Sequence, residues 1–429
     1  MFYNVGEVLS MYDYNLCTNR DVMCIDLKSF FASVSCLLNG FDPMTTKLAV
    51  VGNTKRKGSV VLAATPPLKK LGIKTGSRLY EIPHRKDIYI TNPKMSTYIK
   101  ESNKISKIAL RYVDPSDFHQ YSIDEFMIDV TNSFSLFASN PYELAKLIQD
   151  EIIKATGIKS TIGIGSNVLL AKVSMDIDAK HKSDGIAEWR YEDIPHTLWK
   201  IKSLTDMWGI NTKTAKKLNK RGIFTIKDLA HYPVAFLKRD FGIVGTDLHL
   251  HANGIDESII SKKYETKKSG LGKSQILLRD YEMDEMKVII SEQVEEVFYR
   301  SRLQGKYPNT ISIQIGYSDK GGIRKQFTNK NGFKSTHSII NTLWKYVYDN
   351  ADRTELIRTC AINFTNLKDD NIQQLELFKS QKEMKSEIID HAMDKIRLKY
   401  GKDSVIKANS LTHSGTRLSR KNTLAGHFK

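Results

Sequence analysis

The sequence predicts a multidomain α+β protein, and three observations support this prediction. The chain has 429 residues, more than one ordinary core, since domains usually hold about 100 to 200 residues. Short apolar β-like runs alternate with helical patterns up to about residue 188, and short helices broken by glycine turns follow. A second set of strands and helices begins at Ser274, after a polar stretch. Several separately packed α+β and helical layers are therefore expected.

The first elements lead to a pair of acidic positions. The apolar run Val22–Ile25 predicts a buried strand that delivers Asp26 to its tip, and Gln120–Val130 alternates like a hairpin with Asp124-Glu125 near its bend. Further helices and strands follow from apolar spacing. They are helices over Ser29–Leu38, Pro67–Leu71, Met95–Tyr112, Pro141–Thr156 and Val168–Asp178, and strands over Leu48–Val51, Ser59–Ala64 and Thr161–Gly165.

The second half of the chain is expected to be helical first and mixed afterwards. Glycine turns around Gly209 and Gly242 indicate a small all-helical domain, and the polar, basic stretch Lys262–Lys273 indicates a tether. An α+β layer pair should follow, with an extended, partly helical tail after Asn366. Its elements are strands over Ser274–Arg279, Thr310–Tyr317, Arg324–Thr328 and Arg358–Phe364, and helices over Asp284–Leu303 and Ser335–Asp349.

Composition excludes several protein classes. Hydrophobic residues make up 41% and charged residues 26%, the balance of a globular protein. No apolar run approaches the about 20 residues that cross a bilayer, and the start of the chain is unlike a signal peptide. The four cysteines form no CxxC pair and are expected to be reduced packing residues. We therefore expect a cytoplasmic protein without membrane contact.

The charge is strongly basic and unevenly spread. The net charge is +17, and the segment from Lys47 to Lys107 alone holds 14 basic and three acidic residues. Such a balance is typical of proteins that meet phosphate backbones. A solvated lysine surface is the alternative interpretation, and charge alone names no chemistry.

The acids indicate a magnesium site. Mg²⁺ takes oxygen ligands and is usually held by a few carboxylates together with substrate phosphate, a role open to Asp26, Asp124 and Glu125 if their strands are neighbours. Two such ions can promote in-line displacement at phosphorus. In the alternative interpretation, Asp26 caps the following helix and the other two residues lie in a solvated turn.

Four motifs resemble those of one enzyme family. The segments Ile25-Asp26-Leu27-Lys28-Ser29-Phe30-Phe31-Ala32-Ser33-Val34 and Tyr121-Ser122-Ile123-Asp124-Glu125 resemble the first two motifs of Y-family DNA polymerases. Leu71–Gly76 resembles the fingers segment of that family, and Gly163–Asn167 with Ala171-Lys172-Val173 resembles its third palm motif. Further likeness at Ser77–Ile82 and Ser274–Tyr281 indicates the UmuC and UvrX-like branch of Gram-positive bacteria, their phages and plasmids.

The resemblance implies a right-hand polymerase with a mixed-sheet palm, small fingers, an all-helical thumb with helix-hairpin-helix elements and an α+β little finger. The expected domains are palm 1–33 and 95–188, fingers 34–94, thumb 189–260, tether 261–273, little finger 274–368 and C-terminal tail 369–429. The implied activity is error-prone, translesion DNA synthesis on primer-template DNA from dNTPs, in DNA damage repair or tolerance. Accessory subunits are also compatible with the family.

The resemblance also implies residue roles at the catalytic centre. Asp26 and Asp124 would contact two Mg²⁺ ions, which Mn²⁺ can replace, while Glu125 and the Leu27 carbonyl complete the ligand set. Four residues are assigned to the nucleotide: Phe30, Phe31, Lys69 and Lys172. The Phe31 ring would block a ribose 2′-hydroxyl, Phe30 beside it is expected in the core, and the two lysines would contact the triphosphate unless they are merely solvated.

Two positions depart from the family pattern. Pro66-Pro67 stands where a tyrosine or another polar residue is usual, which puts one phosphate hydrogen bond in doubt. Ser35 stands where glutamate is usual, and it receives no role.

Contacts to DNA and to a partner are implied outside the palm. Gly209 and Gly242 would present backbone N–H groups to phosphates, although both also fit simple helix C-caps. Lys273, Lys325 and Lys330 are expected at the template backbone. The segment Gln374-Leu375-Glu376-Leu377-Phe378 resembles the peptide that docks on the bacterial sliding clamp, where Gln374, Leu375, Leu377 and Phe378 would make the contacts. An edge strand or a helix start is the alternative.

Three functions compete. An error-tolerant DNA polymerase agrees with the acids and the motifs, whereas a catalytically impaired DNA-binding and clamp-binding adaptor would explain Pro66-Pro67. A palm-type nucleotide cyclase would keep the carboxylates but lack domains that grip DNA.

Overall fold

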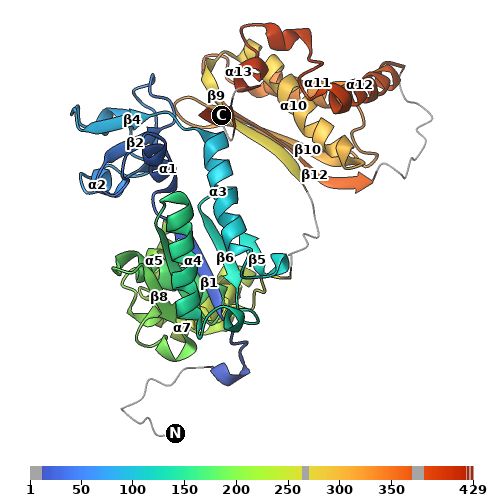
Figure 1. Ribbon diagram of the computed structural model, residues 1–429. Coiled ribbons are helices and arrows are strands. Elements are labelled where there is room, and N and C mark those ends of the chain that lie inside the picture. Colours follow the sequence, from blue (N-terminus) through green and yellow to red (C-terminus); the bar gives the residue numbers. More distant parts are fainter. Residues whose placement is uncertain (1–11, 263–269, 370–380, 422, 425–426, 429) are drawn as a thin grey trace. The chain divides into compact units, whose positions relative to one another are not determined.

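The computed structural model describes residues 12–262, 270–369, 381–421, 423–424 and 427–428 (Figure 1). The chain divides into two compact units. Of the described residues, unit 1 holds 12–262 and 427–428, and unit 2 holds 270–369, 381–421 and 423–424. The division after residue 264 falls within the predicted tether, although strand β9 already begins at Leu271, before the predicted end of the tether.

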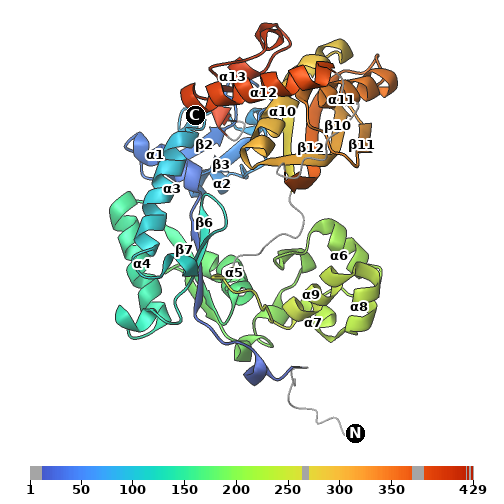
Figure 2. The same cartoon turned by 90° about the vertical axis from the view of Figure 1, so that its right-hand side faces the viewer.

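A five-stranded mixed sheet forms the centre of unit 1, in the order β5-β6-β1-β7-β8. Its strands are β1 (Val22–Leu27), β5 (Phe118–Gln120), β6 (Glu125–Asp129), β7 (Ser160–Gly165) and β8 (Ile186–Trp189). The β7–β8 pair is parallel and the other pairs are antiparallel. Helices α4 (Pro141–Thr156) and α5 (Val168–Ile177) cover opposite faces of the sheet, and α3 (Met95–Ala109) packs beside α4 (Figure 2). Every residue of β7 is buried, as expected for a strand covered on both faces.

Two glycines of β7 set the distance between sheet and helix. A Cβ atom on Gly163 would lie 2.1 Å from the carbonyl oxygen of Ala171, and one on Gly165 would lie 2.2 Å from the Ala171 nitrogen. Any side chain at either position would therefore push α5 away from the sheet. The side chain of Asn167 caps the start of α5 by accepting a 2.8 Å hydrogen bond from the backbone N–H of Leu170.

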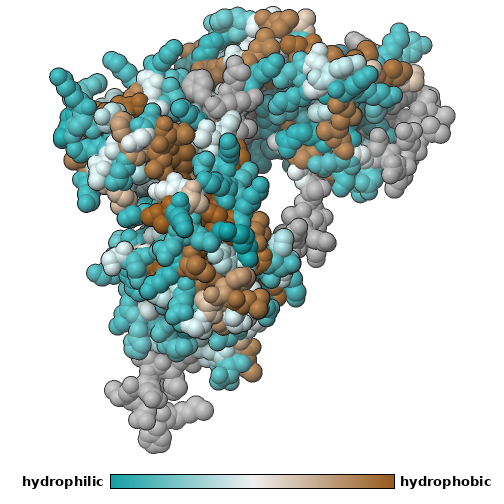
Figure 3. All heavy atoms as spheres, viewed as in Figure 1, coloured by the Kyte–Doolittle hydropathy of each residue, from teal (hydrophilic) through white to brown (hydrophobic). Residues whose placement is uncertain are grey.

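A small sheet in the order β3-β2-β4 forms the predicted fingers. Its strands are β2 (Lys47–Val51), β3 (Val61–Ala64) and β4 (Ile88–Thr91), and helices α1 (Phe30–Leu38) and α2 (Pro66–Lys69) pack against it. Hydrophilic side chains cover the outer rim of this region in the view of Figure 3. Most of the lysines and arginines between Lys47 and Lys107 are exposed, while strands β2 and β3 between them are largely buried.

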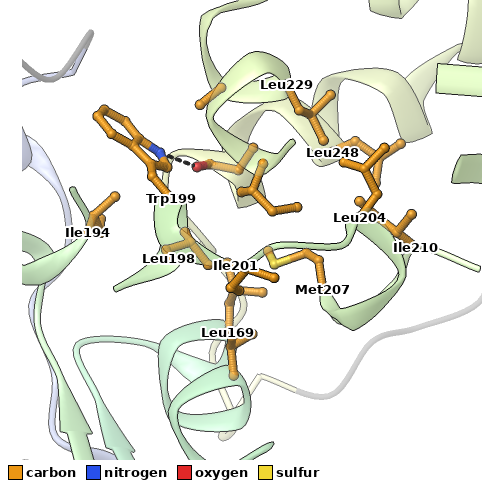
Figure 4. Close-up of a cluster of buried hydrophobic side chains, with 14 of the residues drawn as sticks. Leu169, Ile194, Leu198, Trp199, Ile201, Leu204, Met207, Ile210, Leu229 and Leu248 are labelled. Carbon is orange, nitrogen blue, oxygen red and sulfur yellow. Dashed lines mark hydrogen bonds between the residues drawn. The ribbon is translucent and has the colours of Figure 1, made fainter. Parts of the chain in front are cut away.

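The predicted thumb is helical and has its own apolar core. Its helices are α6 (Thr212–Asn219), α7 (Ile226–His231), α8 (Val234–Phe241) and α9 (Ile243–Ala252). Figure 4 shows side chains of this core, among them Trp199, whose indole N–H donates a 2.9 Å hydrogen bond to the Ala252 carbonyl. Leu169, which belongs to α5, lies in the same cluster, so the base of the thumb shares its core with the palm.

Unit 2 is an α+β layer pair built on an antiparallel sheet in the order β11-β10-β12-β9. The strands are β9 (Leu271–Tyr281), β10 (Lys306–Tyr317), β11 (Gly322–Thr328) and β12 (Ile357–Asp369). Helices α10 (Met286–Leu303) and α11 (Thr336–Asn350) cover one face. The strands alternate between buried apolar residues toward these helices and exposed residues on the other face.

The prediction of a partly helical tail after Asn366 is confirmed for the described residues, but the prediction that this tail is extended is wrong. Strand β12 continues to Asp369, and the described residues beyond it form α12 (Gln381–Tyr400) and α13 (Arg417–Lys421), followed by two-residue strands β13 (Thr423–Leu424) and β14 (His427–Phe428). Helix α12 packs on α11, and its Asp394 pairs with Arg302 of α10. The reason is that charged side chains hold this segment in place, and apolar periodicity does not report such contacts.

Other boundaries differ from prediction by a few residues only. Helix α3 ends at Ala109 rather than Tyr112, and α2 ends at Lys69 rather than Leu71. The helix Pro141–Thr156 is found as predicted. The cysteines are free thiols, and within the described part of the chain no helix has the length and hydrophobicity needed to span a membrane.

Candidate active site

Strand pairing brings the three predicted acids together. Asp26 in β1 lies directly opposite Glu125 in β6, and the backbone N–H of Leu27 donates a 2.8 Å hydrogen bond to the carbonyl of Asp124. Asp124 itself ends the bend between β5 and β6. Residues about one hundred positions apart in sequence therefore share one edge of the sheet.

The chain turns sharply after Asp26. Ser29, the residue directly before α1, has a φ of 50°, a left-handed conformation that costs a residue with a Cβ about 1 to 2 kcal/mol. The next helical turn secures this bend, since the Ser33 hydroxyl donates a 2.6 Å hydrogen bond to the Lys28 carbonyl. Strain held beside a cluster of acids is typical of a functional site.

Each acid of the β6 side has a specific partner. The Ser122 hydroxyl donates a 2.6 Å hydrogen bond to Asp124. Glu125 is buried, and its carboxylate accepts hydrogen bonds from Lys172 at 2.9 Å and from the Cys24 thiol at 3.3 Å. Lys172, predicted as a triphosphate contact, thus holds Glu125 in this structure.

Asp26 is the least compensated of the three acids. Burial raises its pKa to about 6, with smaller contributions from the negative charges of Asp124 and Glu125, while Lys180 opposes the shift. Crowded carboxylates of this kind favour a bound cation, because a cation relieves both the burial and the repulsion.

The donor chemistry of the three acids fits a divalent cation, whereas their present arrangement does not. Carboxylate oxygens are the ligands that Mg²⁺ prefers. As they stand, however, the described residues include no group of three or more His, Cys, Asp or Glu side chains that could hold a metal ion. A cation at this edge therefore requires side chains to change partners, and Glu125 would have to turn from Lys172.

Several lysines lie near the acids. Lys180 Nζ lies 3.9 Å from Asp26 and 2.7 Å from Asp176, which also pairs with Lys172 at 3.0 Å. Burial lowers the pKa of Lys69, Asp26 opposes that shift, and the positive charges of Lys180 and Lys28 add to it. The predicted triphosphate lysine Lys69 is therefore within electrostatic range of Asp26, together with two further lysines.

Two neighbouring phenylalanines differ in environment. Phe30 is buried in the core, as predicted for that residue, whereas Phe31 is only partly buried. The Phe31 ring stacks on Tyr98 of α3, with ring centroids 4.4 Å apart and planes 13° apart. One face of the Phe31 ring is therefore covered by the buried ring of Tyr98.

The two glycines of the thumb occupy turns that require them. Gly209 (φ 88°) precedes α6, and Gly242 (φ 66°) ends α8 and begins α9. A Cβ atom added to either glycine would meet no atom of another described residue within 4 Å, so conformation rather than crowding selects glycine here. Gly242 also satisfies the alternative interpretation as a helix C-cap.

None of the predicted lysines of unit 2 lies on the open face of its sheet. Lys273 pairs with Ile362, which pairs with Ile313 and then with Lys325, so this row points to the helix-covered side of the sheet. Lys273 is bonded to Glu296 of α10, Lys325 is exposed on edge strand β11, and Lys330 is exposed in the following turn. The open face instead carries Arg324, Gln326, Gln314, Asn363 and Ser274.

Sequence reasoning missed several residues of the site. Lys180 follows Asp176 by four residues, and this helical charge spacing was an available signal. Ser122 lies two residues before Asp124 in the second motif, so its hydrogen bond to Asp124 was also an available local signal. No local signal pointed to Cys24 or Tyr98, since each meets its partner through strand pairing or helix packing. The predicted clamp peptide, Gln374–Phe378, lies outside the described residues.

Three family models match the chain. The impB/mucB/samB family matches residues 25–176, its C-terminal domain matches 268–377, and the HHH motif of the IMS family matches 191–223. The HHH match contains Gly209 and not Gly242. The first model spans all three acids and Lys172.

Curated relatives and solved structures agree with these matches. UvrX of Bacillus subtilis (strain 168), whose name associates it with UV-damage repair, is 42% identical over 97% of this chain and 100% of its own. DNA polymerase IV 2 of the same organism is 33% identical over 95% of this chain and 98% of its own. A Y-family DNA polymerase chimera aligns with a TM-score of 0.65 at 22% identity, covering 81% of this chain and 99% of that one, a likeness of fold.

Proposed function

The chain belongs to the impB/mucB/samB family and has the Y-family DNA polymerase fold, and on this premise we propose that it is a template-directed DNA polymerase. It extends a primer with dNTPs and tolerates damaged templates, in the repair or tolerance of DNA damage. The observation that carries the proposal is the pairing of Asp26 with Glu125 beside Asp124, faced by Lys69 and Lys180.

The acids would bind two Mg²⁺ ions, with Mn²⁺ as a substitute. Asp26 and Asp124 would share both ions, with Glu125 and the Leu27 carbonyl as further ligands. When bound, the ions would activate the primer hydroxyl and neutralise the leaving pyrophosphate. Lys172 would hold Glu125 in its present position until a cation competes for that carboxylate.

The remaining residues position the nucleotide. Lys69 and Lys180 supply positive charge for the triphosphate, which compensates for the polar residue that Pro66-Pro67 replaces. Phe31 closes the sugar side of the pocket and would clash with a 2′-hydroxyl. Lys172 would act mainly by holding the Glu125 carboxylate, and less by contacting the triphosphate itself.

DNA contacts would come from several surfaces. The exposed basic fingers and the turns at Gly209 and Gly242 would meet the DNA backbone without reading bases. In the little finger, Lys325 and Lys330 would do the same, whereas Lys273 would first have to release Glu296. The segment Gln374–Phe378 would dock on a sliding clamp. Accessory subunits would bind the polymerase, and the protein would act in the cytoplasm. Binding should weaken steeply with salt.

Primer extension tests the proposal. Wild type, Asp124→Asn and Phe31→Ala are compared on undamaged and lesion-bearing templates with Mg²⁺ and dNTPs or rNTPs. We expect extension by wild type, a loss of about 10³-fold or more in Asp124→Asn, and ribonucleotide entry in Phe31→Ala.

A matched control separates chemistry from folding. Asp150 is exposed on α4 and has no part in the site, so Asp150→Asn should extend primers like wild type. Salt-sensitive DNA binding without extension by wild type would overturn the polymerase proposal and favour the adaptor.

A further inference from the structure

One face of α1 carries two residues that meet the same partner. Phe31 and Ser35 are four positions apart, so they lie one helical turn apart on the same side of α1. Ser35 is buried, although it is polar. A buried hydroxyl in a helix needs a hydrogen-bond partner.

Tyr98 of α3 contacts both residues. Its ring stacks on Phe31 at 4.4 Å, and its hydroxyl lies 2.7 Å from the Ser35 hydroxyl. Tyr98 is fully buried, and Figures 1 and 2 both show α1 beside α3. Two contacts thus hold the Tyr98 side chain: its ring stacks on Phe31, and its hydroxyl is hydrogen-bonded to Ser35.

The two contacts have different consequences. Stacking allows one ring to slide over another at little cost, because dispersion varies slowly with offset. A buried hydrogen bond of normal length tolerates little displacement before it weakens. The Ser35 contact therefore fixes where the Tyr98 ring lies, and the ring in turn fixes how far Phe31 can retreat.

We propose that the Ser35–Tyr98 hydrogen bond positions the Phe31 ring and thereby sets how strongly the nucleotide pocket rejects a ribose 2′-hydroxyl. Ser35 and Tyr98 are positioning residues that act through Phe31. The inference rests on the proposed function, in which Phe31 closes the sugar side of the pocket.

The test measures sugar selectivity in the full-length protein. For each variant, kcat/KM is measured for single insertion of dCTP and of CTP opposite a template guanine. The selectivity ratio is the value for dCTP divided by the value for CTP. Tyr98→Phe keeps the ring and removes its hydroxyl, Ser35→Ala removes the other partner, and Ser35→Thr keeps a hydroxyl at that position. Phe31→Ala serves as the reference for an open pocket.

We expect Tyr98→Phe and Ser35→Ala each to lower the selectivity ratio by about 3- to 10-fold, chiefly by raising kcat/KM for CTP. The double variant should lose no more than the larger single loss, because both remove the same bond. Ser35→Thr should retain most of the wild-type ratio. A loss of overall stability alone would lower both kcat/KM values together and leave the ratio unchanged.

Two failures can be told apart. If Phe31→Ala leaves the ratio unchanged, the role of Phe31 in the proposed function is wrong. If Phe31→Ala lowers the ratio by about 100-fold while Tyr98→Phe and Ser35→Ala leave it at the wild-type value, the positioning inference alone is overturned. Additive losses in the double variant would also overturn it.

Discussion

Two clusters of buried charge differ in how completely they are paired. In unit 2, Arg302 of α10 binds both carboxylate oxygens of Asp394, at 2.5 and 3.0 Å. Glu292 accepts hydrogen bonds from the backbone and hydroxyl of Thr416, at 2.7 to 3.2 Å. In unit 1, by contrast, Asp26 has only Lys180, at 3.9 Å, as an ion-pair partner among the described residues.

The difference in pairing distinguishes charges that stabilise the fold, in unit 2, from Asp26 in unit 1, whose charge is poorly compensated. Desolvation of an ion is offset only by good geometry and hydrogen bonds, which the unit 2 cluster supplies. Asp26 lacks such compensation, and its raised pKa reports the deficit. Within the described part of the chain, the Asp26 carboxylate is thus left without a close ion pair or hydrogen bond from the fold, whereas the acids of unit 2 hold the C-terminal segment in place.

The largest expected effect is on catalysis. Asp26→Asn removes a proposed metal ligand, so primer extension should fall by about 10³-fold, equivalent to about 4 kcal/mol of barrier. Steady-state extension with Mg²⁺ measures the loss, with Asp150→Asn as the exposed control. Extension within 10-fold of wild type would place the catalytic centre elsewhere.

The reverse experiment removes a charge from unit 2. Arg302→Ala leaves Asp394 buried without its partner, so the unfolding free energy of unit 2 should fall by about 3 to 5 kcal/mol. Denaturant unfolding followed by a probe in unit 2 measures this change. Lys287→Ala, on the exposed side of the same helix, should change stability by less than about 0.5 kcal/mol. A similarly small effect at Arg302 would remove the contrast between the clusters.

Because Asp26 lacks a close partner for its charge among the residues that the structure describes, we expect the unfolding free energy to depend on pH. Its pKa is about 6 in the folded protein and about 3.8 when unfolded, so the folded state holds the proton more tightly. Stability from this group is therefore full below about pH 4 and is lost as pH rises through 6. Without divalent cations, Asp26→Asn should be about 3 kcal/mol more stable than wild type at pH 7.5, and nearly equal to it near pH 4. Unfolding in EDTA at both values checks this, and a difference independent of pH would contradict it.

The smallest expected effect concerns the backbone. Among the described residues, two other than glycine have positive φ, Ser29 in unit 1 (50°) and Asn366 in unit 2 (51°). Ser29→Gly should stabilise the protein by about 0.5 to 1 kcal/mol by relieving strain. Asn366→Gly should give no gain, because asparagine tolerates this conformation and its amide donates a 3.0 Å hydrogen bond to Thr310. Equal thermal shifts in the two variants would refute the assignment of strain to the site.

Local patterns were sufficient for much of the molecule. An apolar run ending at Asp26 and a hairpin ending at Asp124-Glu125 are local features, and their order along the chain resembles a known family. The helices and most strands were also predicted, since apolar periodicity depends on near neighbours. Periodicity did not predict how the segment after Asn366 packs, because that packing depends on ion pairs with α10 rather than on an apolar face.

The sequence by itself thus determined the elements, the acids at their ends and the family. Only the tertiary structure decided which side chains meet: Lys180 beside Asp26, Ser35 with Tyr98, and Lys273 turned toward Glu296. Strand register and helix packing bring together groups that lie from 23 to more than 150 residues apart. A contact of that kind is fixed by the whole fold, because it forms only when both of its elements have docked, and no short stretch of sequence encodes it.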